Sequence, residues 1–484
     1  MLRRSVLALF VSLSLLPAAA GRASANGDDF PHQDVADRFR ERYSLPSDPQ
    51  EVDLDKLLEE RFLRVQVGLF TTYMSTLELE EKSAGDEFRD MALALVDAQA
   101  RWLEWMKPVS GDTKATEKDL ATLRTWIKSW RGGALSTVAK DGGADLLVAL
   151  NPKEKTVEAS ERVATIFGSG ATLGIEREEP RFERIVLVPS RKEFVEILCF
   201  VGWLFPDWRH HYWKADVANW TEFFVKDVKV LSLQYPTGGE RYEQGSSMNE
   251  DSPTGMQQQI TQLAMNSMFD NYLGHSVPPE FASGMALNMV IDVYGEARTR
   301  VDGSLKERQT SGYSVFVPGG QSEGGVLPGF SAETRWREDH GADRFVRVLR
   351  QSQQNGAGLA KDAKDKVSHF RLQDENRIKD TVVSGPFFGA AAADFQLPAK
   401  EFLDDYSEFM RSYRCGFVFW LRDESENKKK ATKQFAQLLT DLAHAESLAE
   451  FEKTVTAVYE LPVSEKEIGD KSLEGKFLKW LSKQ

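Results

Sequence analysis

The chain has 484 residues, 41% of them hydrophobic, and a formal net charge of −13 at pH 7. That acidity, with no basic stripe in the sequence, argues against nucleic acid or an anionic membrane surface as a partner. The length is enough for roughly two or three domains with buried cores.

The first residues have the pattern of a signal peptide. Arg3 and Arg4 precede an apolar run from Val6 to Leu16, and the small residues Ala23–Ala25 offer a cleavage site. The run is shorter than the roughly 20 residues that a membrane-spanning helix needs. We therefore expect residues 1–25 to be removed and the protein to be exported to the periplasm or outside the cell, by the Sec or the twin-arginine route. We expect no integral membrane segment after cleavage.

The next two regions differ in periodicity. Residues 26–47 are polar and have no sustained period, which predicts a flexible lead-in. From Val52 onward, apolar residues recur at the spacing of an amphipathic helix, namely Leu54, Leu57, Leu58, Phe62 and Val65. We therefore predict a helical N-terminal region over residues 48–155.

The pattern changes near residue 156. A short β-branched run at Arg184–Ser190 predicts a strand, Arg191–Phe205 predicts a helix, and Asp227–Pro236 predicts a second strand. A polar loop follows, and another helix begins after Pro253. This order predicts an α/β core over residues 156–300.

The last region, residues 301–484, is predicted to be mainly helical, with a buried helix at Glu401–Leu421. The whole chain is therefore expected to be a predominantly helical α+β protein. Its two cysteines, Cys199 and Cys415, lie in apolar segments. They are expected to be buried free thiols, with a single disulfide between them as the alternative.

The most specific pattern is the stretch QQQITQLAMNSMFDNYLGHSVPPEFASGMALNMVIDVYG at residues 257–295. Its segments Gln262–Asn266 and Pro278–Ala286 resemble the peptidase-MA-like (gluzincin) superfamily, especially exported bacterial members of unknown function. The resemblance covers roughly residues 156–484. It implies a gluzincin-like domain, with a small mixed sheet and helices, between the helical N-terminal region and a helical C-terminal part.

In that superfamily, His-Glu-x-x-His on one helix supplies two zinc ligands and a general base, and a Glu on the next helix supplies the third ligand. Carried over, these four positions fall on Gln257, Gln258, Thr261 and Ser283. A register shifted by one residue places Gln258, Gln259 and Gln262 at the first three positions. A neutral amide is a poor zinc ligand and cannot act as a general base. The resemblance thus implies a peptidase-like fold with a degenerate motif, no catalytic residue, no metal and no other cofactor.

Several other residues are candidates for lining a cleft near this motif. His275 and Glu280 flank the loop between the two predicted helices, although a solvent-facing loop would also contain such residues. Trp208, Tyr212 and Trp213 could stack on a ligand or simply pack a helix end.

Three functions remain open from the sequence. The first is a non-catalytic binding or interaction protein, a pseudo-metallopeptidase whose cleft floor is Gln257, Gln258, Thr261 and Ser283. Its partner would be a peptide, a glycan or another protein. The second is a hydrolase with replaced catalytic groups, such as His275 or Glu280. The third is a structural helical module unrelated to peptidases, with no sheet beside the helix at residues 257–273.

Overall fold

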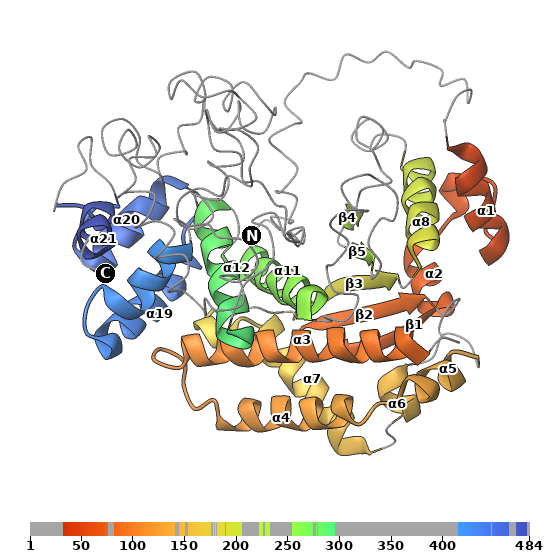
Figure 1. Cartoon of the computed structure of the whole chain (residues 1–484), viewed down its shortest axis with the longest axis horizontal. Helices are drawn as coiled ribbons and strands as arrows, with labels where there is room; N and C mark the ends of the chain where they lie inside the picture. Colours follow the sequence, from red (N-terminus) through yellow and green to blue (C-terminus); the bar gives the residue numbers. More distant parts are fainter. Residues whose placement is uncertain are drawn as a thin grey trace, which may run out of the picture.

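The computed structural model describes residues 32–75, 82–140, 145–150, 153–175, 178, 180, 182–188, 190–205, 222–225, 228–232, 254–273, 277, 279–295, 415–446, 448–463 and 471–481. Helices surround one mixed sheet, and the C-terminal helices pack beside the helix pair α11–α12 (Figure 1). The prediction of a predominantly helical α+β fold is therefore confirmed.

The sheet contains five described strands in the order β1-β2-β3-β5-β4. Their bounds are Phe62–Val67 (β1), Phe70–Ser75 (β2), Glu183–Val188 (β3), Glu222–Val225 (β4) and Val228–Ser232 (β5). The central strands β2, β3 and β5 are parallel, and β1 and β4 pair antiparallel at the two edges. The predicted strands at Arg184–Ser190 and Asp227–Pro236 correspond to β3 and β5.

The two faces of the sheet lie in different cores, because successive side chains of a strand point to opposite sides. Ile185 and Leu187 of β3 belong to the larger core, with helix α3 (Lys82–Met106) and with α11 and α12. Val186 and Val188 belong to a second core, with α1 (Gln33–Tyr43), α2 (Leu54–Arg61) and α8 (Arg191–Leu204). Figure 1 shows α8 and α1 together at one end of the sheet.

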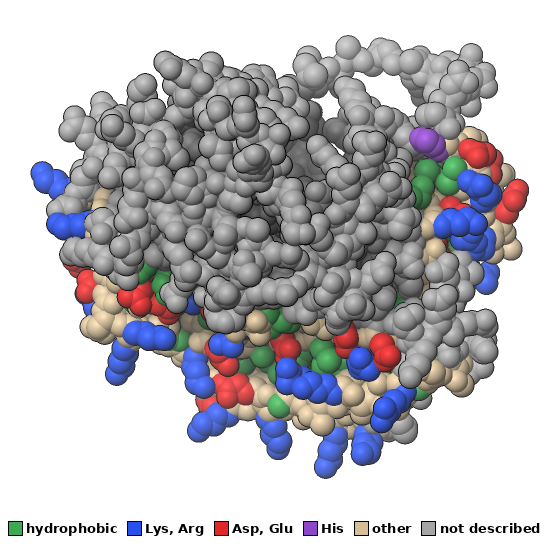
Figure 2. Space-filling view, viewed as in Figure 1, with side chains coloured by type: hydrophobic (Ala, Val, Ile, Leu, Met, Phe, Trp, Pro, Cys, Tyr) green, Lys and Arg blue, Asp and Glu red, His purple; other side chains and the backbone are tan. Residues whose placement is uncertain are grey.

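The remaining elements extend the larger core. Helices α4 and α7 pack on each other, and α4 packs on α3. Acidic and basic side chains are interspersed over the outer helices at the lower edge of Figure 2, and Arg162 and Asp119 join α7 to α4. The bounds are Lys114–Lys128 (α4), Gly132–Lys140 (α5), Leu146–Leu150 (α6), Glu154–Gly168 (α7), Thr254–Tyr272 (α11), Pro279–Tyr294 (α12), Lys428–Leu442 (α19), Leu448–Tyr459 (α20), Leu473–Leu481 (α21), the 3-10 turns Pro49–Glu51 (η2) and Ala171–Leu173 (η3), and the π-helical segment Trp420–Glu424 (η7).

The prediction that residues 48–155 form a purely helical region is wrong at β1 and β2. Phe62 and Val65, which fit a helical period, lie in β1 and pair with β2. The turn between these strands contains Gly68 at φ 60°, a conformation that glycine adopts at low cost. Gln99 of α3 fixes the hairpin, because its side chain donates to Val67 O and accepts from Leu69 N, each at 2.9 Å.

The prediction of a flexible lead-in at residues 26–47 is also wrong, because α1 lies within it. Ala36, Phe39 and Tyr43 recur at helical spacing and are buried against the α8 side of the sheet. The predicted helix at Glu401–Leu421 lies partly outside the described residues. From Cys415 it continues as a short α-helix and then as the π-helical segment.

Helix α11 shares its core with the sheet. An extended helical array without a sheet beside this helix, the arrangement that the third functional hypothesis requires, is therefore not the one observed. Among the described residues, no helix combines the length and apolarity needed to cross a membrane.

Candidate functional site

The residues that resemble the zinc-peptidase motif lie on the helix pair α11–α12. Helix α11 packs on both α12 and α3, so residues on several sides of it are buried. Buried apolar residues such as Ile260, Leu263 and Met265 recur around the helix rather than along a single stripe. An interior helix of this kind places polar side chains in contact with protein on most sides.

The motif positions on α11 are almost entirely enclosed. Gln258 and Thr261 are each 0% exposed, and Gln262 of the alternative register is 0% exposed as well. Gln257 is half-buried. The prediction that these side chains form the floor of an open cleft is therefore wrong for Gln258 and Thr261. The side chains of Gln259, Glu280 and Ser283, and all of His275, Trp208, Tyr212 and Trp213, lie outside the described residues.

Thr261 has a specific partner across the helix pair. Its Oγ1 lies 3.0 Å from the hydroxyl oxygen of Tyr294, the last residue of α12. Burial, together with the nearby carboxylates of Asp97 and Asp90, raises the pKa of Tyr294 well above its ordinary value, although the hydrogen bond with Thr261 opposes this. The two groups are therefore neutral hydroxyls, and neither is a base at neutral pH.

The contact with Tyr294 also separates Thr261 from the proposed third-ligand position. Ser283 and Tyr294 are 11 residues apart on α12, which corresponds to about 16 Å along the axis at 1.5 Å per residue. Even after the length of the tyrosine side chain and its 3.0 Å contact with Thr261 are subtracted, the remaining separation exceeds the roughly 4 Å between donor atoms of one zinc site. Thr261 and Ser283 thus stand at different levels of the helix pair.

A second polar cluster, which sequence reasoning missed, fixes α12 to the C-terminal part. Arg422 of the π-helical segment makes a two-pronged ion pair with Asp292 of α12, with N–O distances of 2.7 and 3.1 Å. Trp105 of α3 donates to the same carboxylate at 2.8 Å, and the guanidinium lies 5.0 Å from the Trp105 ring centroid. One turn earlier, Asn288 donates to Cys415 O at 2.9 Å.

This cluster is built around a buried charge. Burial alone would lower the pKa of the Arg422 guanidinium, but the carboxylates of Asp292 and Asp423 outweigh it and raise the pKa. Arg422 therefore stays charged and holds three segments together. The sequence signal that could have found it is a charged residue within otherwise apolar stretches, as in VIDVY and FWLRDE.

The described residues contain no group of three or more His, Cys, Asp and Glu side chains placed to hold a metal ion. Cys199 and Cys415 are buried thiols that are not joined by a disulfide, as predicted, and they belong to different cores.

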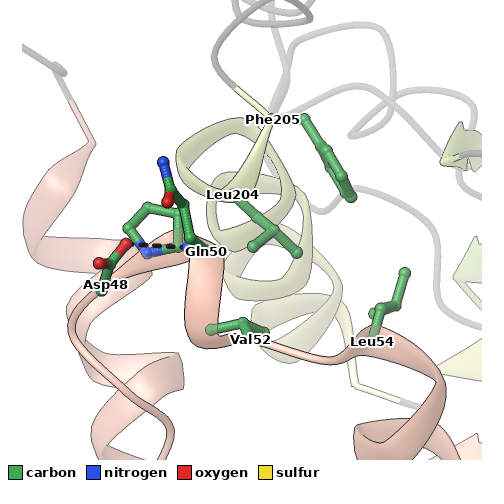
Figure 3. Close-up of a pocket in the computed structure, with 7 residues that line it drawn as sticks. Asp48, Gln50, Val52, Leu54, Leu204 and Phe205 are labelled. Atoms are coloured by element: carbon green, nitrogen blue, oxygen red, sulfur yellow. Dashed lines mark hydrogen bonds between the residues drawn. The ribbon is translucent and has the colours of Figure 1, made fainter.

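A pocket of about 370 Å³ lies away from the motif, on the α8 side of the sheet. Figure 3 shows Val52, Leu54, Leu204 and Phe205 around it, with Asp48 and Gln50 at its rim. Asp48 caps the adjacent 3-10 turn by accepting from the backbone N–H of Gln50 at 2.9 Å. The lining of the pocket is mainly apolar, and none of its residues was a candidate site residue in the sequence analysis.

Comparison of the chain with models of known families, with curated proteins and with solved structures found no match.

Proposed function

We propose that this chain is an exported, non-catalytic protein with a peptidase-like scaffold, which acts by binding a peptide, a glycan or another protein. The resemblance at residues 257–295 supports the scaffold. The order of elements supports it too, because strand β3 and helix α8, which belong to the resemblance, precede β4, β5 and the pair α11–α12.

The observation that carries the proposal is the use of the motif positions in packing. Thr261 is bonded to Tyr294, and Thr261 and Gln258 have no exposed surface. These positions offer substrate neither a metal nor a general base, so hydrolysis through the motif has no chemical route. Gln257 keeps partial exposure, so a ligand would meet this helix near its N-terminal end.

The test is the metal content and hydrolytic activity of the purified mature chain. We expect less than about a tenth of an equivalent of zinc after mild dialysis. We also expect no cleavage of casein or of a quenched peptide library, with or without added zinc. Near one equivalent of zinc with chelator-sensitive cleavage would overturn the proposal. Cleavage that resists chelation would overturn it in favour of a hydrolase with replaced groups.

A variant separates contaminating activity from activity of this chain. In Thr261→Val the hydroxyl at the motif position is removed with little change in shape. Cleavage that disappears in this variant while the fold is retained would also contradict the proposal. Cleavage activity that is unchanged in every variant and is removed by further purification would come from a contaminating protease. That result would agree with the proposal that this chain is inactive.

A further inference from the structure

Helix α1 occupies an aromatic groove beside α8. Its buried residues Ala36, Phe39 and Tyr43 face this groove. The Phe39 ring lies 4.7 Å from the Phe200 ring, and the Tyr43 ring stacks 6.0 Å from Phe62 (centroid distances). The contact is therefore that of an amphipathic helix packed on an apolar surface.

Two buried carboxylates of α8 line the same groove, and α1 supplies partners for both. Glu193 and Glu196 are each only 2% exposed. Arg42 pairs with Glu196 at 2.6 Å, and the Tyr43 hydroxyl donates to Glu193 at 2.8 Å. Ser75, at the end of β2, donates to the other oxygen of Glu193 at 2.6 Å.

These partners explain how two carboxylates are tolerated in one groove. A buried carboxylate without partners is costly, so the groove requires a cation and a hydroxyl donor beside its aromatic floor. Glu193 and Glu196 are three residues apart on α8 and so share one face of that helix. Helix α1 meets both requirements with an arginine next to a tyrosine.

Helix α1 depends on this groove for its structure. Among the described elements, α8 is the one with which α1 makes extensive contact. An isolated helix of 11 residues is marginal in water, where roughly 12–15 residues or more are needed. Ser44 at φ 51° ends the helix in a left-handed conformation, and the chain turns away there. Such a peripheral segment opens at lower free energy than the core.

We propose that the α1 groove is a recognition site for a partner helix that carries an arginine beside a tyrosine, and that α1 covers it in cis until such a helix displaces it. The proposal rests on the proposed binding function and names the chemistry of its partner. Helix α1 is then an autoinhibitory segment. A partner helix presents the same two contacts, to Glu196 and to Glu193.

The test uses the full chain and a labelled peptide with the α1 sequence, residues 32–46, followed by fluorescence anisotropy. The variant Phe39→Ala removes the aromatic anchor of α1 and leaves the groove intact. The apparent affinity for the peptide decreases as the fraction of molecules with a covered groove increases. We therefore expect this variant to bind the peptide at least about tenfold more tightly than the wild type. A peptide with Arg42→Glu should bind the Phe39→Ala variant at least about thirtyfold more weakly than the unchanged peptide does.

Glu41→Ala is the matched control, because Glu41 is exposed on the same helix. It should bind the peptide no better than the wild type. Equal binding by wild type and a folded Phe39→Ala variant would overturn the proposal, as would equal binding of the two peptides. If Phe39→Ala does not fold, hydrogen exchange of the wild type decides. The amides of α1 should exchange through an opening of lower free energy than the amides of α8. Equal protection of the two helices would overturn the proposal. Neither outcome of the peptide experiment changes the result of the zinc and hydrolysis test, so the two proposals can fail separately.

Discussion

Replacing Thr261 with valine tests whether the motif position has become structural. Valine keeps the β-branched shape and removes one hydroxyl, so helix propensity and volume change little. The Tyr294 hydroxyl then loses its partner 3.0 Å away in partly buried surroundings. A buried polar group left unsatisfied costs about 1–3 kcal/mol, and we expect a loss of stability of that size.

The assay is denaturant unfolding followed by circular dichroism, with Tyr294→Phe and the double variant measured beside Thr261→Val. Each single variant should lose about 1–3 kcal/mol. The double variant should lose less than the sum, by about 1 kcal/mol, because removing both partners leaves no orphaned group.

Thr125→Val provides the control, since the Thr125 hydroxyl is exposed and donates only within its own helix, to Ala121 O at 2.8 Å. It should change stability by no more than about 0.5 kcal/mol. Additive losses in the double variant, or a Thr261→Val variant as stable as the wild type, would refute the hydroxyl pair.

Three further outcomes are expected. Gly68→Ala should cost about 2–4 kcal/mol in denaturant unfolding, from backbone strain and overpacking, because its Cβ would lie 2.2 Å from Gln99 Oε1 at φ 60°. Arg422→Met should cost about 3–5 kcal/mol in the same assay, because it leaves the Asp292 carboxylate uncompensated. Burial raises the pKa of Cys199 to about 12, so native chain should resist alkylation at pH 8 and react fully once denatured. The same raised pKa stabilises the fold below the ordinary thiol pKa of about 8.5. The free energy of unfolding, measured at a series of alkaline pH values, should therefore decrease as the pH rises from about 8.5 toward about 12.

The elements predicted correctly carry strong local signals. For α8, Ser190 is the N-cap and accepts from the backbone N–H of Glu193, and an apolar run follows it. For β3, a β-branched run with a proline after it is enough to indicate a strand. Signals of this kind act within a few residues, so one sequence suffices to read them.

The elements predicted wrongly depend on distant partners. The β1–β2 hairpin has a two-residue turn that Gln99 fixes from a helix later in the chain, and an apolar spacing at Phe62 and Val65 fits a helix equally well. Helix α1 has few apolar residues, and it is held by aromatic rings and carboxylates that come more than a hundred residues later. Three apolar residues at helical spacing among charged neighbours are too few to indicate the helix on their own.

At the positions that resemble the motif, the sequence shows uncharged residues but not the contacts that they make. The partner of Thr261 depends on the register of α11 against α12, which no local pattern sets. Once α3 and α12 enclose this helix, a carboxylate at position 258 would be buried, at a cost of several kcal/mol unless it were paired. An amide and a hydroxyl cost far less when they are hydrogen-bonded. The uncharged residues at positions 258 and 261 and the enclosure of this helix are thus mutually consistent. Glu at position 258 and His at position 261 would place ionisable groups in an enclosed interface, and Thr261 and Ser283 would still lie at different levels of the helix pair.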